Sequence, residues 1–201
     1  MSAYLRPIVL VHGLWDSPYL FKRLRKSLEE MGRIVLVPHL PHAYGAVSLS
    51  NLAQDLDEYI CKQLGKEVAI DLLGFSMGGL ISRVWLQQLN GSIRTTRFIS
   101  VGSPHKGTFT AQIVPRFLFA GIADMKRGSI LLQELNNDLN ALRKIECISF
   151  FCKLDLMVFP GWQAVLPIGV SFAMPVLTHK GLIRSSYARE LLLKELVKVR
   201  D

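Results

Sequence analysis

The sequence predicts an α/β fold, with a doubly wound, mainly parallel sheet of about six strands and a helical insertion. Short runs rich in Val and Ile alternate with segments of helical periodicity, and this alternation is typical of βαβ units. The runs 8–11 and 68–73 are nearly continuous in apolar residues, as strands covered by helices on both faces must be. With 201 residues, 50% of them hydrophobic, the chain suits a single domain spanning 1–201.

The strands and helices are expected to alternate along the chain. The strands are predicted at 7–12, 33–38, 67–73, 96–101, 145–151 and about 168–176. In the first helix, Ser17 can act as the N-cap and Pro18 can take the first position, and Gly32 ends the apolar stripe. Further helices are predicted at about 52–65, 77–89 and 184–199.

Residues 104–144 separate two predicted strands by far more than a usual βα connection. The segment is rich in large apolar residues, which predicts a cap, a lid or additional core helices. We expect Phe117 and Phe119, together with Trp15, to contact a substrate. Ile122 and Trp162 are further candidates for the pocket or its rim. The alternative is that all four side chains only complete the core.

Ser76 is the candidate nucleophile. It lies in Gly74-Phe75-Ser76-Met77-Gly78, after a predicted strand and at the start of a predicted helix. In that setting Gly-x-Ser-x-Gly forms a strained elbow that exposes the serine oxygen above the sheet. The bare pattern is common by chance, so the strand and helix around it are what favour a nucleophile.

Two backbone N–H groups are candidates to stabilise an oxyanion. The N–H of Met77 stands at the positive end of the predicted helix dipole. The second donor is expected from Leu14, in the His12-Gly13-Leu14-Trp15 loop after the first strand, where Gly13 allows close backbone approach. For His12 two interpretations stay open, shaping of this loop or a satisfied structural histidine.

A serine nucleophile needs an imidazole base and a carboxylate that fixes its tautomer. Asp155 and His179 each follow a predicted strand, at the edge where a doubly wound sheet gathers its site. The order Ser76, Asp155, His179 is the one expected for a Gly-x-Ser-x-Gly hydrolase.

Other residues compete for the acid and base roles. His39 and His42 stand in the wrong chain order for the base, whereas His105 follows a strand near the site and is the better rival. Asp124 and Asp138 are weaker alternatives to Asp155, because both lie in the long insertion.

Charge and cysteine content limit the function classes. The net charge of +8 is dispersed and interleaved with acids, which favours solvated helix faces over a nucleic-acid surface. Contact with an anionic membrane remains an alternative interpretation of the basic residues. No zinc-ligand set is present, and Cys61, Cys147 and Cys152 are expected to be buried reduced thiols. With neither a signal-peptide pattern nor a membrane-spanning run, we expect a cytoplasmic protein that is soluble or peripheral to a membrane.

The chain resembles the lipase and esterase branch of the α/β-hydrolase superfamily, including small bacterial triacylglycerol-lipase-like proteins. The resemblance rests on segments 9–15, 74–79 and 102–108, and on Asp155 and His179. It implies a minimal form of that fold and an esterase activity, with Ser76, Asp155 and His179 as the triad. It also implies that His105 belongs to a recurring lipase segment and not to the triad.

The expected reaction is hydrolysis of carboxylic esters with an apolar acyl group, through an acyl-enzyme on Ser76 and without metal or organic cofactor. A thioesterase or acyltransferase would use the same triad and differ only in leaving group or acceptor. A non-catalytic binding protein would usually have lost a triad member, and none is missing here. The expected partner is a small-molecule ester or lipid, the expected oligomeric state is a monomer, and no nucleic acid is expected.

Overall fold

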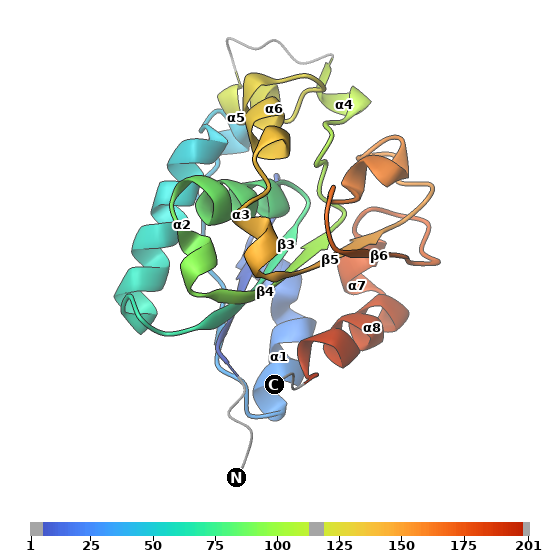
Figure 1. Cartoon of the computed structure of the whole chain (residues 1–201). Helices are drawn as coiled ribbons and strands as arrows, with labels where there is room; N and C mark the ends of the chain where they lie inside the picture. The colour runs from blue at the N-terminus through green and yellow to red at the C-terminus, as the bar shows by residue number, and fades with distance from the viewer. Residues whose placement is uncertain (1–5, 113–118, 199–201) are drawn as a thin grey trace.

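A computed structural model describes residues 6–112 and 119–198. Its centre is one six-stranded sheet in the order β2-β1-β3-β4-β5-β6, and every neighbouring pair of strands is parallel (Figure 1). The strands are β1 (Ile8–Val11), β2 (Val35–Leu36), β3 (Ile70–Phe75), β4 (Thr95–Val101), β5 (Glu146–Phe151) and β6 (Val170–Ala173). The predicted fold class is confirmed.

The strand β3 departs most usefully from its prediction. It begins at Ile70 instead of 67 and ends at Phe75 instead of 73. Gly74 and Phe75 remain in the ladder because they pair with Ser100 and Val101 of β4. The sheet therefore holds the chain rigidly up to the residue before Ser76.

Helices cover both faces of the sheet (Figure 1). They are α1 (Lys22–Glu30), α2 (Leu49–Leu64), α3 (Met77–Gln88), α4 (Phe109–Gln112), α5 (Ala120–Asp124), α6 (Ile130–Asn137), α7 (Gly181–Arg184) and α8 (Ser186–Leu196). The predicted cap at Ser17 is wrong, because its side chain makes no capping bond and a 3₁₀ turn, Pro18–Phe21, precedes α1. The predicted last helix corresponds to α8, which begins at Ser186 because Ser185 is extended and its side chain accepts the N–H of Ala188; the short α7 before it was not predicted.

The core has two apolar layers, one on each side of the sheet. Strand side chains alternate between them, so Val9 and Val11 pack with α2 and α3 while Ile8 and Leu10 pack with α1 and α8. The alternation leaves both faces of the central strands buried, as their continuous apolar sequences predict.

The long segment 104–144 contributes α4, α5 and α6. Side chains of α5 and α6, among them Ile122, Leu132 and Leu135, belong to the same core layer as α2 and α3. Phe119 is only partly buried against this layer. Where it is described, most of the segment thus adds to the core, and its movement as a lid stays a prediction.

The cysteines are unpaired thiols in the structure. Cys147 and Cys152 are buried, whereas Cys61 is half-buried. Burial raises the pKa of Cys147 to about 12, so this thiol stays protonated and unreactive. Within 6–112 and 119–198, no helix is long and apolar enough to span a bilayer.

Candidate active site

Ser76 sits at a tight elbow between β3 and α3. Its backbone has φ 54° and ψ −125°, a strained conformation for a residue other than glycine, and its N–H donates to the Val101 carbonyl at 2.9 Å. The elbow can close because residue 78 is glycine, since a Cβ there would collide with the carbonyl oxygens of Val11 and His12. Sheet and helix together hold the Ser76 side chain at the carboxyl edge of the strands.

Asp155 and His179 form a buried pair. The Nδ1 of His179 donates to Oδ2 of Asp155 at 2.7 Å, which leaves Nε2 as the nitrogen that can accept a proton. Among the described residues, that Nε2 has no hydrogen-bond partner. The other Asp155 oxygen accepts the N–H groups of Met157 at 2.9 Å and Val158 at 3.0 Å. The carboxylate is thus fixed at both oxygens, and it in turn orients the imidazole.

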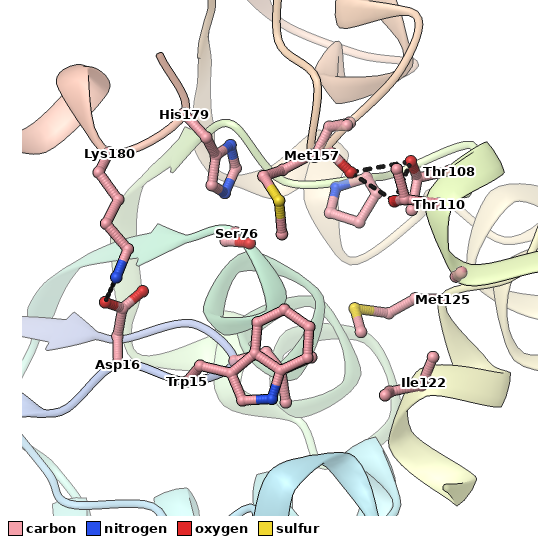
Figure 2. Close-up of a pocket in the computed structure, with 14 residues that line it drawn as sticks. Trp15, Asp16, Ser76, Thr108, Thr110, Ile122, Met125, Met157, His179 and Lys180 are labelled. Atoms are coloured by element: carbon pink, nitrogen blue, oxygen red, sulfur yellow. Dashed lines mark hydrogen bonds and ion pairs between the residues drawn. The ribbon is translucent and has the colours of Figure 1, made fainter. Parts of the chain in front are cut away.

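Ser76 and His179 line the same cavity, which has a volume of about 290 Å³. Figure 2 shows the His179 ring beside Ser76 at one end of this cavity. The Phe75 ring packs against His179 with ring centroids 4.8 Å apart, and so restricts the imidazole from a second side. A hydroxyl and an unpartnered imidazole nitrogen therefore meet at one cavity wall.

The loop after β1 approaches Ser76 closely. A Cβ at Gly13 would lie 2.8 Å from the Cβ of Ser76, so only glycine fits without displacement. Leu14 follows in this loop and lines the cavity, and Met77, as the first residue of α3, has an N–H without a partner in the helix. Leu14 and Met77, the two residues predicted to supply oxyanion donors, therefore both lie near Ser76.

His12 shapes this loop from a buried position. Its Nε2 accepts the Leu40 N–H at 3.2 Å, and its Nδ1 lies 3.1 Å from the Gly13 carbonyl oxygen. Burial lowers the pKa of His12, which keeps the ring neutral and suited to both contacts. The sequence left open whether His12 shapes the loop or is a structural histidine with its hydrogen bonds satisfied. Both hold, because the contacts that satisfy the ring also hold the loop.

The cavity lining is mainly apolar, and the sequence predicted only part of it. Trp15 lines the cavity, beside Ile122, Met125 and Met157 (Figure 2). Phe119 is not among the lining residues and packs partly against the core instead, because α5 starts at the next residue and turns it toward that layer. Phe117 lies outside the described residues.

One polar pair at the cavity was missed by sequence reasoning. Lys180 Nζ lies 2.9 Å from Asp16 Oδ1, so an ion pair joins the loop after β1 to the loop that carries His179 (Figure 2). The two residues are far apart in sequence, and no local pattern links them. Within the described ranges, no group of three or more His, Cys, Asp or Glu side chains could hold a metal ion.

The other histidines and aspartates considered for the acid and base roles lie outside the cavity lining and make local structural contacts. His105 is fully buried outside the cavity lining, with Nε2 2.6 Å from Ser100 Oγ. His39 and His42 contact the His12 ring at centroid distances of 6.1 and 6.0 Å, away from the lining. Asp124 accepts the Leu49 N–H, and the Asp138 carboxylate accepts the N–H of Asn140.

The buried histidines predict how stability depends on pH. Burial, and secondarily the charge of Arg83, holds the pKa of His105 well below its usual value, while burial chiefly lowers that of His12. Below about pH 6.5 the unfolded chain therefore binds more protons than the folded one. As the pH falls below about 6.5, we therefore expect the free energy of unfolding to decrease. Each histidine contributes at most about 1.4 kcal/mol of this decrease per pH unit.

Urea unfolding from about pH 7.5 to 5.5 measures this dependence. His105→Gln should show a shallower decline with falling pH than the wild type, whatever its stability at neutral pH. Equal slopes in the two proteins would contradict the assignment.

A family model of palmitoyl protein thioesterases matches residues 7–140, which is more than half of the chain. The chain belongs to the palmitoyl protein thioesterase family. The match includes Ser76 and the loop after β1, whereas Asp155 and His179 lie beyond it.

Relatives in this family agree with the match. The chain is 30% identical over 122 residues to lysosomal thioesterase PPT2 of Bos taurus, covering 59% of this chain and 39% of that protein. The PPT2 of Homo sapiens is 30% identical over 121 residues, with 58% and 40% covered. The match thus spans about two fifths of the length of these curated relatives.

Solved structures share the fold. The mature Bacillus licheniformis lipase BlEst2 has a TM-score of 0.76 at 17% identity, covering 98% of this chain and 93% of that one. Aspergillus fumigatus lipase B has a TM-score of 0.77 at 15% identity, with 96% and 52% covered. The resemblance to lipase-like α/β-hydrolases is confirmed at the level of fold.

Proposed function

We propose that this protein is a serine acyl hydrolase that cleaves carboxylic esters or thioesters through an acyl-enzyme on Ser76. One observation carries the proposal. The buried Asp155–His179 hydrogen bond leaves Nε2 of His179 without a described partner, on the cavity that also holds Ser76 at its elbow. A base oriented by a carboxylate beside an exposed hydroxyl is the arrangement that acyl transfer needs.

In the first half-reaction, the Ser76 oxygen attacks the carbonyl carbon while Nε2 of His179 takes the hydroxyl proton. The negative charge moves to the carbonyl oxygen, where the N–H groups of Leu14 and Met77 stabilise it. The imidazolium then gives its proton to the departing alcohol or thiol, and the acyl group stays on Ser76.

In the second half-reaction, water attacks the acyl-enzyme as Nε2 of His179 accepts a proton from it. Collapse of the tetrahedral intermediate releases the acid, and the proton returns to the Ser76 oxygen. Asp155 keeps its hydrogen bond to Nδ1 of His179 and so stabilises the imidazolium that forms twice in each cycle.

The cavity wall indicates which end of the substrate it binds. Ile122, Met125 and Met157 supply apolar surface next to Ser76, which suits an acyl chain better than a polar leaving group. Trp15 supplies an aromatic wall from the loop after β1. We therefore expect esters with an apolar acyl chain to be cleaved faster than acetyl esters.

A thioester is the second candidate substrate, and the family match favours it. The matched relatives are named thioesterases, and the attack on Ser76 is unchanged when sulfur leaves in place of oxygen. Aryl esters and N-acetylcysteamine thioesters with the same acyl chains would separate the two classes. We expect both to be cleaved, with the same preference for chain length because one cavity holds the acyl group.

The comparison has two contrary outcomes. Cleavage of esters with no cleavage of matched thioesters would remove the second candidate. If neither class were cleaved above the background of Ser76→Ala, the proposed function itself would fail.

The cellular location and oligomeric state remain predictions. The matched relatives carry the word lysosomal in their names, which does not support the expected cytoplasmic location. A monomer is still expected.

A further inference from the structure

The loop after β5 exposes an unusual amount of apolar surface. Within residues 154–162, five large apolar side chains are exposed, and we refer to them as the apolar rim. They are Leu154, Leu156, Met157, Phe159 and Trp162. Leu156 is 77% exposed and Trp162 61%. Apolar side chains gathered in this way usually mark an interaction surface.

The apolar rim is held firmly in its exposed position. Asp155 accepts the N–H groups of Met157 and Val158, and the Met157 carbonyl accepts hydroxyl hydrogens from Thr108 at 3.0 Å and Thr110 at 2.7 Å. Thr108 Oγ1 also accepts the Phe159 N–H at 3.2 Å. These contacts make the exposure a feature of the fold and not of a frayed loop.

The apolar rim borders the candidate active site through Met157. Met157 both lines the cavity and is 44% exposed, so one side chain joins the rim to the inside (Figure 2). Phe109 extends the surface, because its N–H donates to the Phe159 carbonyl at 3.4 Å. The Arg127 guanidinium lies 4.5 Å from the centre of the Phe109 ring, which adds a positive charge at this margin.

The exposed charged residues next to the apolar rim in the sequence are basic. From 147 to 189 the one acidic residue is Asp155, and it is buried against His179. Lys153 precedes the rim directly and is exposed, and the exposed Lys106 is tied to the same region because its N–H donates to the Gln163 carbonyl at 3.2 Å. Apolar side chains beside lysines match the acyl boundary and head groups of an anionic membrane.

We propose that the apolar rim docks this protein on an anionic lipid bilayer, with the cavity mouth facing the membrane. Leu156 and Trp162 enter the interfacial region, and Lys153 lies at the level of the anionic head groups. The acyl chain of a membrane-embedded substrate then reaches Ser76 past Met157 without crossing water. The inference deepens the proposed hydrolase function, since it names where that site meets its substrate.

Vesicle co-sedimentation tests the docking directly. The full chain is mixed with phosphatidylcholine–phosphatidylserine vesicles or with pure phosphatidylcholine vesicles, in the Ser76→Ala background so that no turnover is involved. We expect binding to the anionic vesicles, and the double variant Leu156→Ser with Trp162→Ser should lower the partition coefficient by about tenfold or more. Lys153→Glu should weaken binding to the anionic vesicles and change binding to pure phosphatidylcholine little.

A matched control replaces an apolar side chain elsewhere. Ile93 is 85% exposed just before β4, at the amino ends of the strands and so at the opposite end from Ser76. Ile93→Ser should therefore bind vesicles like the parent. When Ser76 is retained, the double variant should hydrolyse a short soluble ester at the rate of the wild type. That result would show that its fold and site are intact. That rate tests the hydrolase independently of membrane binding.

Four results would overturn the docking proposal. The parent chain could fail to sediment with either vesicle, or the double variant could bind as tightly as the parent, or Ile93→Ser could weaken binding to the same extent. Loss of cleavage of a soluble acyl-peptide by the double variant, with vesicle binding unchanged, would assign the apolar rim to peptide recognition and would also overturn it.

Discussion

Replacing Ser76 with alanine is expected to lower kcat on esters and thioesters by about 10⁴-fold to 10⁶-fold. The variant loses the atom that attacks the carbonyl carbon, while the oxyanion donors and the cavity remain. Alanine takes the same positive φ with a side chain no larger than serine, so the elbow should persist. Hydrolysis of an aryl ester series by wild type and variant measures the effect, with thermal melting as the check on folding.

The interpretation depends on the residual rate. A small remaining activity, unchanged by serine-directed acylating inhibitors, would agree with catalysis by the binding site and oxyanion donors alone. A kcat within a few fold of wild type would show that another group attacks the substrate, and the whole assignment would fall with it.

Replacing Asp155 with asparagine is expected to lower kcat by up to about 10⁴-fold, by analogy with serine proteases. The Asn oxygen can keep the Met157 and Val158 N–H groups, so its amide NH₂ would face Nδ1 of His179. Nδ1 must then accept a hydrogen bond, which moves the ring proton to Nε2. A ring protonated there cannot take the Ser76 proton, although the structure is otherwise retained.

Asp124→Asn is the matched control, because Asp124 is another partly buried carboxylate that accepts a backbone N–H. It should leave kcat near the wild-type value. If Asp124→Asn removed activity and Asp155→Asn did not, the acid role would move to the insertion. Equal melting temperatures for wild type and Asp155→Asn would show that the loss is chemical and not structural.

Local patterns explain why much of the architecture could be predicted from sequence. Parallel strands buried on both faces must be apolar throughout, so β1 and β3 could be predicted from their apolar runs. The turn at Ser76 could be predicted because it requires glycines at fixed positions around the serine. Asp155 and His179 could be paired because parallel strands end at a common edge, and chain order then selects among the carboxylates.

The remainder depended on contacts between distant residues. The Asp16–Lys180 pair and the hold of Thr108 on the Met157 carbonyl join segments with no shared local pattern. Phe119 looked like a pocket residue because composition reports apolar content and not direction, and the start of α5 turned it toward the core. Ser17 failed as a cap for a similar reason, since a 3₁₀ turn intervened before α1.

The double use of the Asp155 carboxylate has a consequence for how substrates enter. Moving the loop 156–159 away from the cavity would break the hydrogen bonds from the Met157 and Val158 N–H groups to the buried Asp155 carboxylate. Breaking both would cost about 3 kcal/mol or more. Fewer than about one molecule in a hundred would then be open at any moment. On this side the cavity entrance therefore has a fixed width. For the proposed hydrolase we expect selection among acyl groups by their width and shape at this entrance, without a rate-limiting opening of the loop.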